Sequence, residues 1–445
     1  MATNVSYANS DTILEALVLH TLPDFGPHGD GIINNNFLLA MLKENKRKLQ
    51  RRLRRKQYAD QPKPMFKANN IAYKIGEKVG AVGYGGIGAI HTLVRGLKLD
   101  RLINDNVELL QRHVPYHESD HVLNLAFNLL AGGDCLEDLE LRRNDEAYLD
   151  GLGAQRIPDP TTAGDFCRRF TAADVRALME TINQVRLNVW RSQPRSFFQR
   201  AVLDADGTLV STTGQCKQGM DISYQGQWGY HPLVLSLANT GEPLFLVNRS
   251  GNRPSHEGAA EYIDQAIALC RQAGFRRIAV RGDTDFTQTR HLDRWDADGV
   301  EFYFGIDATP NLVGYAESLP EAAWKLLPRQ PRYDVKTRPR TRPTNVKEQV
   351  VRQRQFENIV LQSEQVAEFA YRPTACDKLY SLVVVRKNLT VEKGEQALFD
   401  DIRYFFYITN DTGATMEEVV QQGRDRCNQE NLIAQLKGGV PALQM

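Results

Sequence analysis

The chain has 445 residues, 42% hydrophobic and 24% charged, which suits two or three globular domains with a substantial core. No run of about 18 apolar residues is present, so we expect no transmembrane helix, and a formal net charge of +1 by itself argues against nucleic-acid binding. With no signal-peptide pattern and six widely spaced cysteines, we expect a cytoplasmic protein without a disulfide framework or zinc site.

The neutral total hides a dense basic run inside residues 1–65. Leu42, Leu49 and Leu53 recur through it at helical spacing, which predicts a basic helix with a thin apolar seam. Such a helix can neutralise DNA phosphates and release counterions; the alternative is a solvated, poorly ordered charge run. The bases that we expect to contact DNA here are Lys46, Arg47, Lys48, Arg51, Arg52, Arg54 and Arg55.

Residues 68–192 show helical patterning. Residues 120–130 carry apolar side chains on one face, and Thr171 can cap an amphipathic helix that runs to about Trp190. Pro158-Asp-Pro-Thr-Thr is typical of a turn followed by a helix start. We therefore predict a mainly helical N-terminal region.

The pattern changes at Phe197 to buried strands. Three strands come in hairpin order and are followed by helix, strand, helix and strand, which predicts a mixed sheet with helices on its faces. The expected strands span 200–206, 232–238, 243–247, 277–283 and 300–306, and the expected helices span 257–273 and 287–297.

Residues 310–400 interrupt this alternation. A proline-rich basic stretch includes Arg338, Arg340 and Arg342, which we expect to contact DNA as a second patch. Three short alternating runs at 358–361, 366–371 and 379–385 then predict a β-rich insertion. Residues 404–408 return to buried-strand character just before the last helix.

The last segment predicts a single helix in which Thr415 and Glu418 form a capping box. At about 100° per residue, Arg426 lies about 40° and Lys437 about 20° from Glu430, so two cations flank one carboxylate. The alternative is an ordinary Arg–Glu pair at i,i+4, worth a few tenths of a kcal/mol.

Acidic residues follow two of the predicted strands. Asp204 and Asp206 end one strand, and Asp283 and Asp285 follow another, so they and Glu430 can converge at the crevice where α/β sheets bind ligands. Carboxylates suit Mg²⁺, and two such ions can activate an attacking oxygen and stabilise a leaving one in phosphodiester chemistry. The alternative for each Asp pair is a capped turn between strand and loop.

Together these motifs resemble the DDE transposases of bacterial insertion sequences. The segments are 203–208 (Leu-Asp-Ala-Asp-Gly-Thr), 281–286 (Arg-Gly-Asp-Thr-Asp-Phe) and the last helix, whose Arg426, Glu430 and Lys437 follow the branch pattern Tyr-x2-Arg-x3-Glu-x6-Lys. Segments 158–166 and 249–252 also resemble one subgroup. The resemblance covers roughly 68–437 and implies an RNase H-like mixed sheet with flanking helices, interrupted by the β-rich insertion.

The resemblance also implies residue roles. The first catalytic and metal-binding acid is Asp206, two residues before Thr208, with Asp204 in reserve because alternation puts it on the same strand face. The second is Asp283, with Asp285 the alternative, and the third is Glu430. Arg426 and Lys437 are implied to contact DNA phosphates near the cleavage site.

The implied activity is Mg²⁺-dependent cleavage at the ends of an insertion sequence and strand transfer into target DNA, with Mn²⁺ able to substitute. A hairpin route and other routes both remain open. The implied partners are double-stranded DNA of the terminal inverted repeats and the target, and a second copy of the chain on DNA. The expected location is the bacterial cytoplasm, at the nucleoid.

We expect four regions: a DNA-binding region at 1–195, the first part of the core at 196–310, the insertion at 311–400, and the final core strand and catalytic helix at 401–445. Two departures from the family pattern support an alternative. Gly423 replaces the expected tyrosine, and the chain ends eight residues after Lys437. The alternative is a truncated, inactive transposase that binds element ends as a repressor.

Two further motifs favour ordinary structural roles. Gly83-Tyr-Gly-Gly-Ile-Gly88 fits the dinucleotide-binding pattern, but no convincing strand precedes it, so a close helix–helix contact is the preferred interpretation. His113, His117 and His121 are four residues apart, but Pro115 interrupts any helix that would align them as metal ligands.

Overall fold

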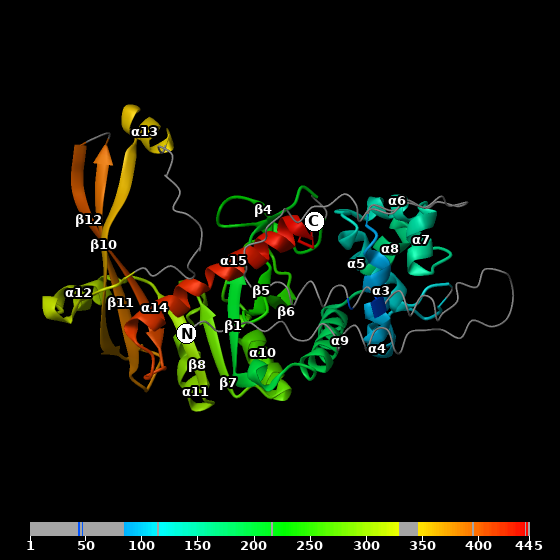
Figure 1. The fold of residues 1–445 in the computed structure, drawn as a ribbon, viewed down its shortest axis with the longest axis horizontal. Coiled ribbons are helices and arrows are strands. Elements are labelled where there is room, and N and C mark those ends of the chain that lie inside the picture. The colour runs from blue at the N-terminus through cyan, green and yellow to red at the C-terminus, as the bar shows by residue number, and fades with distance from the viewer. Residues whose placement is uncertain are drawn as a thin grey trace. The chain divides into compact units, whose positions relative to one another are not determined.

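The computed structural model describes residues 43, 44, 47, 84–113, 115–214, 217–328, 346–393, 396–440 and 442–443. From Tyr84 to Gln199 the described chain is helical, as predicted (Figure 1). Its α-helices are α3 (Ile87–Gly96), α4 (Leu99–Asn106), α5 (Glu118–Leu130), α6 (Leu139–Arg143), α7 (Glu146–Leu152), α8 (Pro160–Cys167) and α9 (Ala172–Trp190). Among the described residues, no helix combines the length and apolar content needed to cross a bilayer.

Local sequence explains where several of these helices begin. The Thr171 side chain accepts a hydrogen bond from the backbone N–H of Asp174, whose carboxylate in turn accepts from the Thr171 N–H, so α9 starts with a capping box. At α8 the Asp159 carboxylate accepts from the Thr162 N–H, and Pro160 takes the first helical position, where its missing N–H costs nothing. Both predicted helix starts are confirmed.

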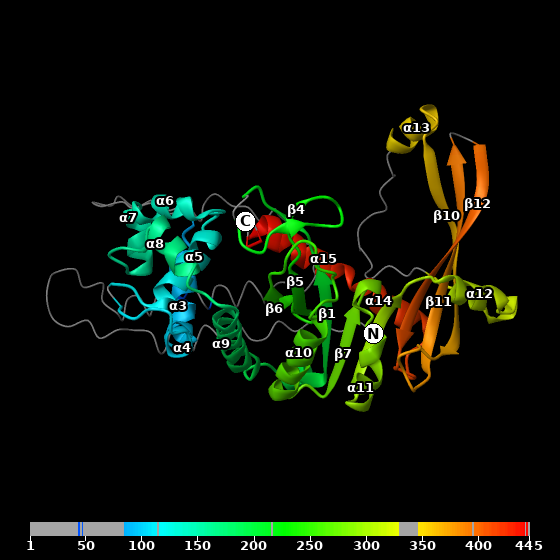
Figure 2. The same cartoon turned by 180° about the vertical axis from the view of Figure 1, so that it is seen from behind.

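The sheet of the core is mixed, as predicted. Strand β1 (Arg200–Gly207) pairs antiparallel with β5 (Leu233–Leu237), which pairs antiparallel with β6 (Glu242–Val247). On its other side β1 pairs parallel with β7 (Arg277–Gly282), and β7 pairs parallel with β8 (Val300–Ile306). The resulting order, β6-β5-β1-β7-β8, is the arrangement expected of an RNase H-like core (Figures 1 and 2).

The strands after residue 320 continue this sheet. Ile408 and Phe304 are register partners where β12 (Gln396–Thr409) pairs antiparallel with β8. The order then runs outward through β11 (Tyr380–Lys393) and β10 (Glu357–Tyr371) to the short β9 (Lys325–Leu326). Residues 404–408, expected as a separate core strand, are the end of β12. Helices α12 (Pro310–Ser318) and α13 (Val346–Gln353) complete this region.

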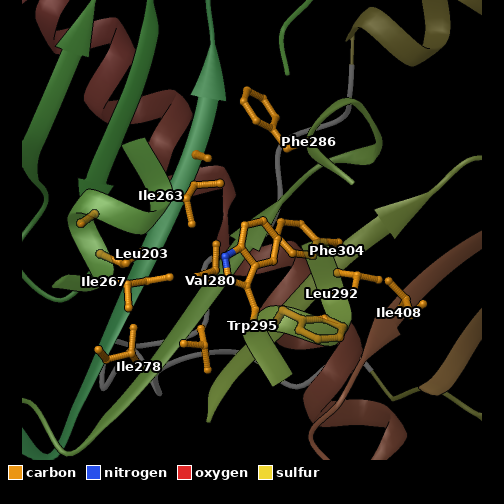
Figure 3. Close-up of a cluster of buried hydrophobic side chains, with 14 of the residues drawn as sticks. Leu203, Ile263, Ile267, Ile278, Val280, Phe286, Leu292, Trp295, Phe304 and Ile408 are labelled. Atoms are coloured by element: carbon orange, nitrogen blue, oxygen red, sulfur yellow. The ribbon is translucent and has the colours of Figure 1, made fainter. Parts of the chain in front are cut away.

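The two faces of the sheet bury different side chains, as strand alternation requires. Leu203 of β1 and Val280 of β7 point to one face, where they pack with α10 (Ala259–Ala273) and α11 (Leu292–Ala297) (Figure 3). The buried members labelled there include Ile263, Ile267, Ile278, Phe286, Leu292, Trp295, Phe304 and Ile408. The alternate positions of β1 and β7 are therefore directed to the opposite face.

The opposite face is covered by the last helical segment. Val419 and Val420 of α14 (Met416–Asp425) are buried there against Ala279, Val383 and Val385. The predicted capping box at Thr415 is present: the Glu418 carboxylate accepts from the Thr415 N–H at 2.8 Å.

The expected single helix is interrupted, however. It breaks at Arg426, resumes as α15 (Cys427–Ala434) and ends in a π-helical turn (Gln435–Gly439). The backbone at Arg426 itself stays in the α region, with φ −57° and ψ −21°, so the first interruption is confined to one residue.

A small antiparallel sheet lies between β1 and β5 in the sequence. It contains β2 (Val210–Ser211), β3 (Asp221–Ile222) and β4 (Trp228–Tyr230), in the order β2-β4-β3. Gly229 of β4 is required because a Cβ there would lie 2.9 Å from the Cα of Ser211. The sheet thus follows directly from the end of β1 that carries Asp206.

Candidate active site

Asp206 and Asp283 lie at the ends of neighbouring parallel strands. The β1–β7 register pairs Asp204 with Arg281, so two residues further Asp206 is level with Asp283, which directly follows β7. Leu203 is buried on the α10 face, so alternation directs Asp204 and Asp206 toward the face of α14 and α15. The fold thus brings together two acids that are 77 residues apart in the sequence.

A single guanidinium lies between these two carboxylates. Arg426 Nη1 is 3.2 Å from Asp206 Oδ2 and 3.7 Å from Asp283 Oδ2. Helical spacing predicted that Arg426 flanks Glu430 on one stripe, but the ion pairs of the described residues place its guanidinium on the two aspartates. Helical spacing gives the direction in which a side chain leaves the helix but not which acid its far end reaches, and the two aspartates lie within reach of this guanidinium.

The ionised form of Asp206 is unfavourable in this site. Burial raises its pKa to about 6; the charge of Arg426 opposes the rise, and the charges of Asp283 and Glu430 add to it. Burial also raises the pKa of Asp283, again against Arg426. Both acids therefore resist ionisation until more positive charge is supplied, which fits a site for a divalent cation.

This shift predicts a pH-dependent stability difference. Between about pH 4 and pH 6 folded Asp206 holds a proton that the unfolded chain has lost, so its ionisation makes stability fall as pH rises through that window. In EDTA, Asp206→Asn is expected to be more stable than the parent at pH 7, by on the order of 1–3 kcal/mol, and equal to it near pH 4. Urea denaturation at the two pH values measures this.

The opposite sign serves as a control. The Thr162 backbone N–H lowers the pKa of Asp159, so ionisation of Asp159 stabilises the fold as pH rises. Asp159→Asn should therefore be less stable than the parent at pH 7, and the difference should shrink toward pH 4. If Asp206→Asn behaves like Asp159→Asn, the electrostatic description of Asp206 is wrong.

Glu430 is exposed on α15, and its neighbour anchors that helix. Gln429 is 2% exposed; its Nε2 donates to the Val234 carbonyl at 3.1 Å, and its Oε1 accepts from the Ser236 hydroxyl. Both partners lie on β5, next to β1. Gln429 therefore fixes α15 across the strand beside the acids and sets the position of Glu430.

Removing this anchor should destabilise the fold. Gln429→Leu leaves the buried Ser236 hydroxyl without its acceptor, and a cost of about 1–3 kcal/mol is expected. The neighbouring Asn428→Leu, at an exposed position, should cost less than about 0.5 kcal/mol. Urea denaturation compares the two, and equal costs would show that Gln429 is no anchor.

Asp204, the reserve candidate, is engaged in a buried ion pair. Its two oxygens accept from Arg281 Nε at 2.6 Å and Nη2 at 2.7 Å, and the two side chains are 1% and 5% exposed. Arg281 also donates to Gln422 of α14 at 3.3 Å. The Asp204–Arg281 pair thus links β1, β7 and α14, whereas Asp206 is the acid next to Asp283.

The two cations of the last segment contact protein in this structure. Lys437 Nζ donates to the Leu209 carbonyl at 2.8 Å, just beyond β1, and burial lowers its pKa. Of the other predicted DNA contacts, Arg47 is helical and exposed. The rest lie outside the described residues: Lys46, Lys48, Arg51, Arg52, Arg54, Arg55, Arg338, Arg340 and Arg342.

Within the described residues, the tightest groups of potential metal ligands lie elsewhere: His113, His117 and Glu118, and Asp134, Cys135 and Asp138. The first group starts α5, where Glu118 accepts from the backbone N–H groups of Leu109 and Leu110, an ordinary structural role. His121 is instead buried, stacked on Phe166. A Cβ at Gly88 would lie 2.9 Å from the Gly151 carbonyl of α7, so that glycine permits a close helix contact, as the sequence favoured.

Two acids at adjacent strand ends, faced by a helix carrying a third, form the arrangement implied for the catalytic domain of a transposase. The sequence profile described as Transposase DDE domain group 1 matches residues 76–444. The chain belongs to the DDE transposase family.

Among solved structures, the chain is similar to piggyBac transposase in a cryo-EM synaptic complex with hairpin DNA. The identity is 12% and the TM-score 0.32, over 76% of this chain and 65% of that one. The chain thus spans less than two thirds of that protein's length. Curated protein sequences gave no match.

Three contributors to the site were missed by sequence reasoning. Arg281 stands inside a buried strand, where a basic residue needs an acidic partner, so the sequence could have indicated an ion pair there. The structure shows that the partner is Asp204, its register neighbour on β1. Gln429 lies four residues before the buried Ile433, so helical spacing could have placed it on the packed face. The pairing of Arg426 with the aspartates had no comparable signal.

Proposed function

We propose that this protein cleaves DNA at the ends of an insertion sequence and joins the freed ends to target DNA. The observation that supports this most directly is the level placement of Asp206 and Asp283 on parallel strands, with Glu430 on the helix that crosses beside them. Membership of the DDE family makes phosphodiester chemistry the natural use of such a site.

The three carboxylates are the groups that would hold Mg²⁺, or Mn²⁺ in its place. When bound, the metal activates the attacking oxygen and stabilises the leaving one. In the first step a water oxygen bonds to phosphorus, the bond from phosphorus to the 3′-oxygen breaks, and a 3′-hydroxyl is freed. In the second step that hydroxyl attacks a phosphodiester of the target, releasing another 3′-hydroxyl. Asp206 is the acid proposed for the first ligand, in preference to Asp204, which is bound to Arg281.

Arg426 has two roles in this proposal. Without metal its guanidinium compensates the charge of Asp206 and Asp283. A cation placed between the two carboxylates would displace it, and the freed guanidinium can then contact a DNA phosphate, the role implied by the family pattern. Lys437, at the other end of α15, is the second proposed phosphate contact.

The remaining regions are assigned on the same basis. Residues 1–195, with their basic run, would bind the terminal inverted repeats; 196–310 and 401–445 would form the catalytic core; and 311–400 would add DNA contacts. Two copies would bring two element ends together. Such a protein acts on DNA in the bacterial cytoplasm, at the nucleoid.

The purified full chain, incubated with labelled duplexes copied from the DNA that flanks its gene, tests the proposal. Mg²⁺-dependent nicks at one fixed position, absent in EDTA and on a shuffled duplex, are the expected result. Specific binding without nicking in Mg²⁺ or Mn²⁺ would replace the proposal with the end-binding repressor. If the chain neither binds nor nicks the end duplexes, both the proposed function and the repressor alternative are overturned.

A further inference from the structure

Gly423 of α14 is in unusually close contact with the ring of Tyr407 on β12. A Cβ built at Gly423 would lie 2.7 Å from Tyr407 Cδ1 and closer still to Cε1. Carbon atoms that are not bonded do not approach so closely, so the ring occupies the space in which any side chain at position 423 would begin. The ring of Tyr407 can therefore take this position only because residue 423 has no side chain.

Tyr407 lies on the face of the sheet that α14 covers, not on the face that α11 covers. Its neighbours Phe406 and Ile408 are buried in the layer under α11, so alternation along β12 directs Tyr407 to the α14 face. There it packs on the cluster that contains Val419 and Val420. The ring is therefore held between the strand and the backbone of the helix.

This contact lies one helical turn before Arg426. Residues three apart share a helix face, so the ring that packs on Gly423 and the side chain of Arg426 belong to the same face of this segment. Burial raises the pKa of Tyr407, against the opposing charges of Arg424 and Arg426, so the phenol is neutral at physiological pH.

We propose that Tyr407 is a positioning residue, which by packing on Gly423 holds the guanidinium of Arg426 between Asp206 and Asp283. It acts through Arg426 and needs no contact with DNA. It also supplies from β12 an aromatic group beside the helix position where the family pattern has tyrosine and this chain has Gly423. Its effect on cleavage rests on the proposed function; its effect on Arg426 does not.

A double-mutant cycle separates positioning from simple packing. The variants are Tyr407→Ala, Arg426→Gln and both together, and the readouts are Mn²⁺ affinity by titration calorimetry and the rate of end cleavage. Arg426 competes with a cation for the aspartates. Releasing Arg426 by Tyr407→Ala should therefore raise Mn²⁺ affinity by about tenfold in the parent chain. In the Arg426→Gln background the same substitution should change it less than twofold.

Two controls sharpen the result. Tyr404 lies on the same strand but packs on Trp324 and Phe406, so Tyr404→Ala should leave Mn²⁺ affinity unchanged. Gly423→Tyr should disturb the site by itself, and adding Tyr407→Gly should restore Mn²⁺ affinity to within threefold of the parent because the new ring fills the vacated space.

Equal effects of Tyr407→Ala with and without Arg426 would overturn the inference. The Mn²⁺ readout needs the proposed metal site but not the proposed reaction, so a parent chain that binds no Mn²⁺ would overturn both the inference and the proposed function. If the parent chain binds Mn²⁺ with the expected coupling but does not nick DNA, the function fails and the positioning role stands. If the parent nicks DNA but the effects of the two substitutions simply add, the proposed function stands and the positioning role of Tyr407 fails.

Discussion

Asp283→Asn is expected to lower the rate of end cleavage by at least about 10³-fold, equivalent to about 4 kcal/mol of lost transition-state stabilisation. Asparagine keeps the shape of the side chain but removes the charge that would hold the metal. Binding to end DNA should stay within about threefold of the parent. The measurement is single-turnover cleavage in Mg²⁺ alongside a binding titration in Ca²⁺.

Asp285 provides the matched control two residues away. It is exposed and accepts a hydrogen bond from Ser255 at 3.0 Å, away from Arg426. Asp285→Asn should therefore retain cleavage within about fivefold. If Asp285→Asn is the inactive variant and Asp283→Asn is active, the alternative acid of the Arg281–Phe286 segment is the catalytic one. Cleavage that survives both substitutions would remove this strand end from the active site.

The second large effect concerns stability. Arg281→Met should destabilise the fold by about 3–5 kcal/mol, because it leaves the carboxylate of Asp204 buried without a compensating charge. Arg277→Met on the same strand should cost no more than about 1 kcal/mol, since that side chain is 58% exposed. Urea denaturation in EDTA measures both.

A double variant distinguishes the charge effect from lost packing. Asp204→Leu combined with Arg281→Met removes both charges, and it should regain most of the stability lost in the single variant. A double variant as unstable as Arg281→Met would show that the guanidinium matters through its shape. A single variant as stable as Arg277→Met would contradict the buried pair altogether.

The sequence predicted the core well because strong local patterns and short connections agree there. Residues 200–207 hold an apolar run followed by acids, residues 277–282 directly precede Asp283, and both are strands of one sheet, with α10 between them and α11 after them. Thr171 and Thr415 marked helix starts through hydrogen bonds that depend on neighbouring residues alone. Such features need no knowledge of distant contacts.

The finer geometry of the site depends on contacts that periodicity does not contain. The direction of Arg426 follows from ion pairs with acids on two strands far away in the sequence. The tight fit between Gly423 and Tyr407 also joins separate elements, so a pattern of residue types along α14 could register the missing tyrosine but not the ring that fills its place.

The pairing of β12 with β8 has a consequence for synthesis of the chain. Ile408 is the register partner of Phe304, so this edge of the sheet is closed by residues made about one hundred positions later. Until then β8 is an open edge on the nascent chain, with hydrogen-bonding groups available to other chains. The order of translation therefore leaves this edge of β8 unpaired until β12 has been made.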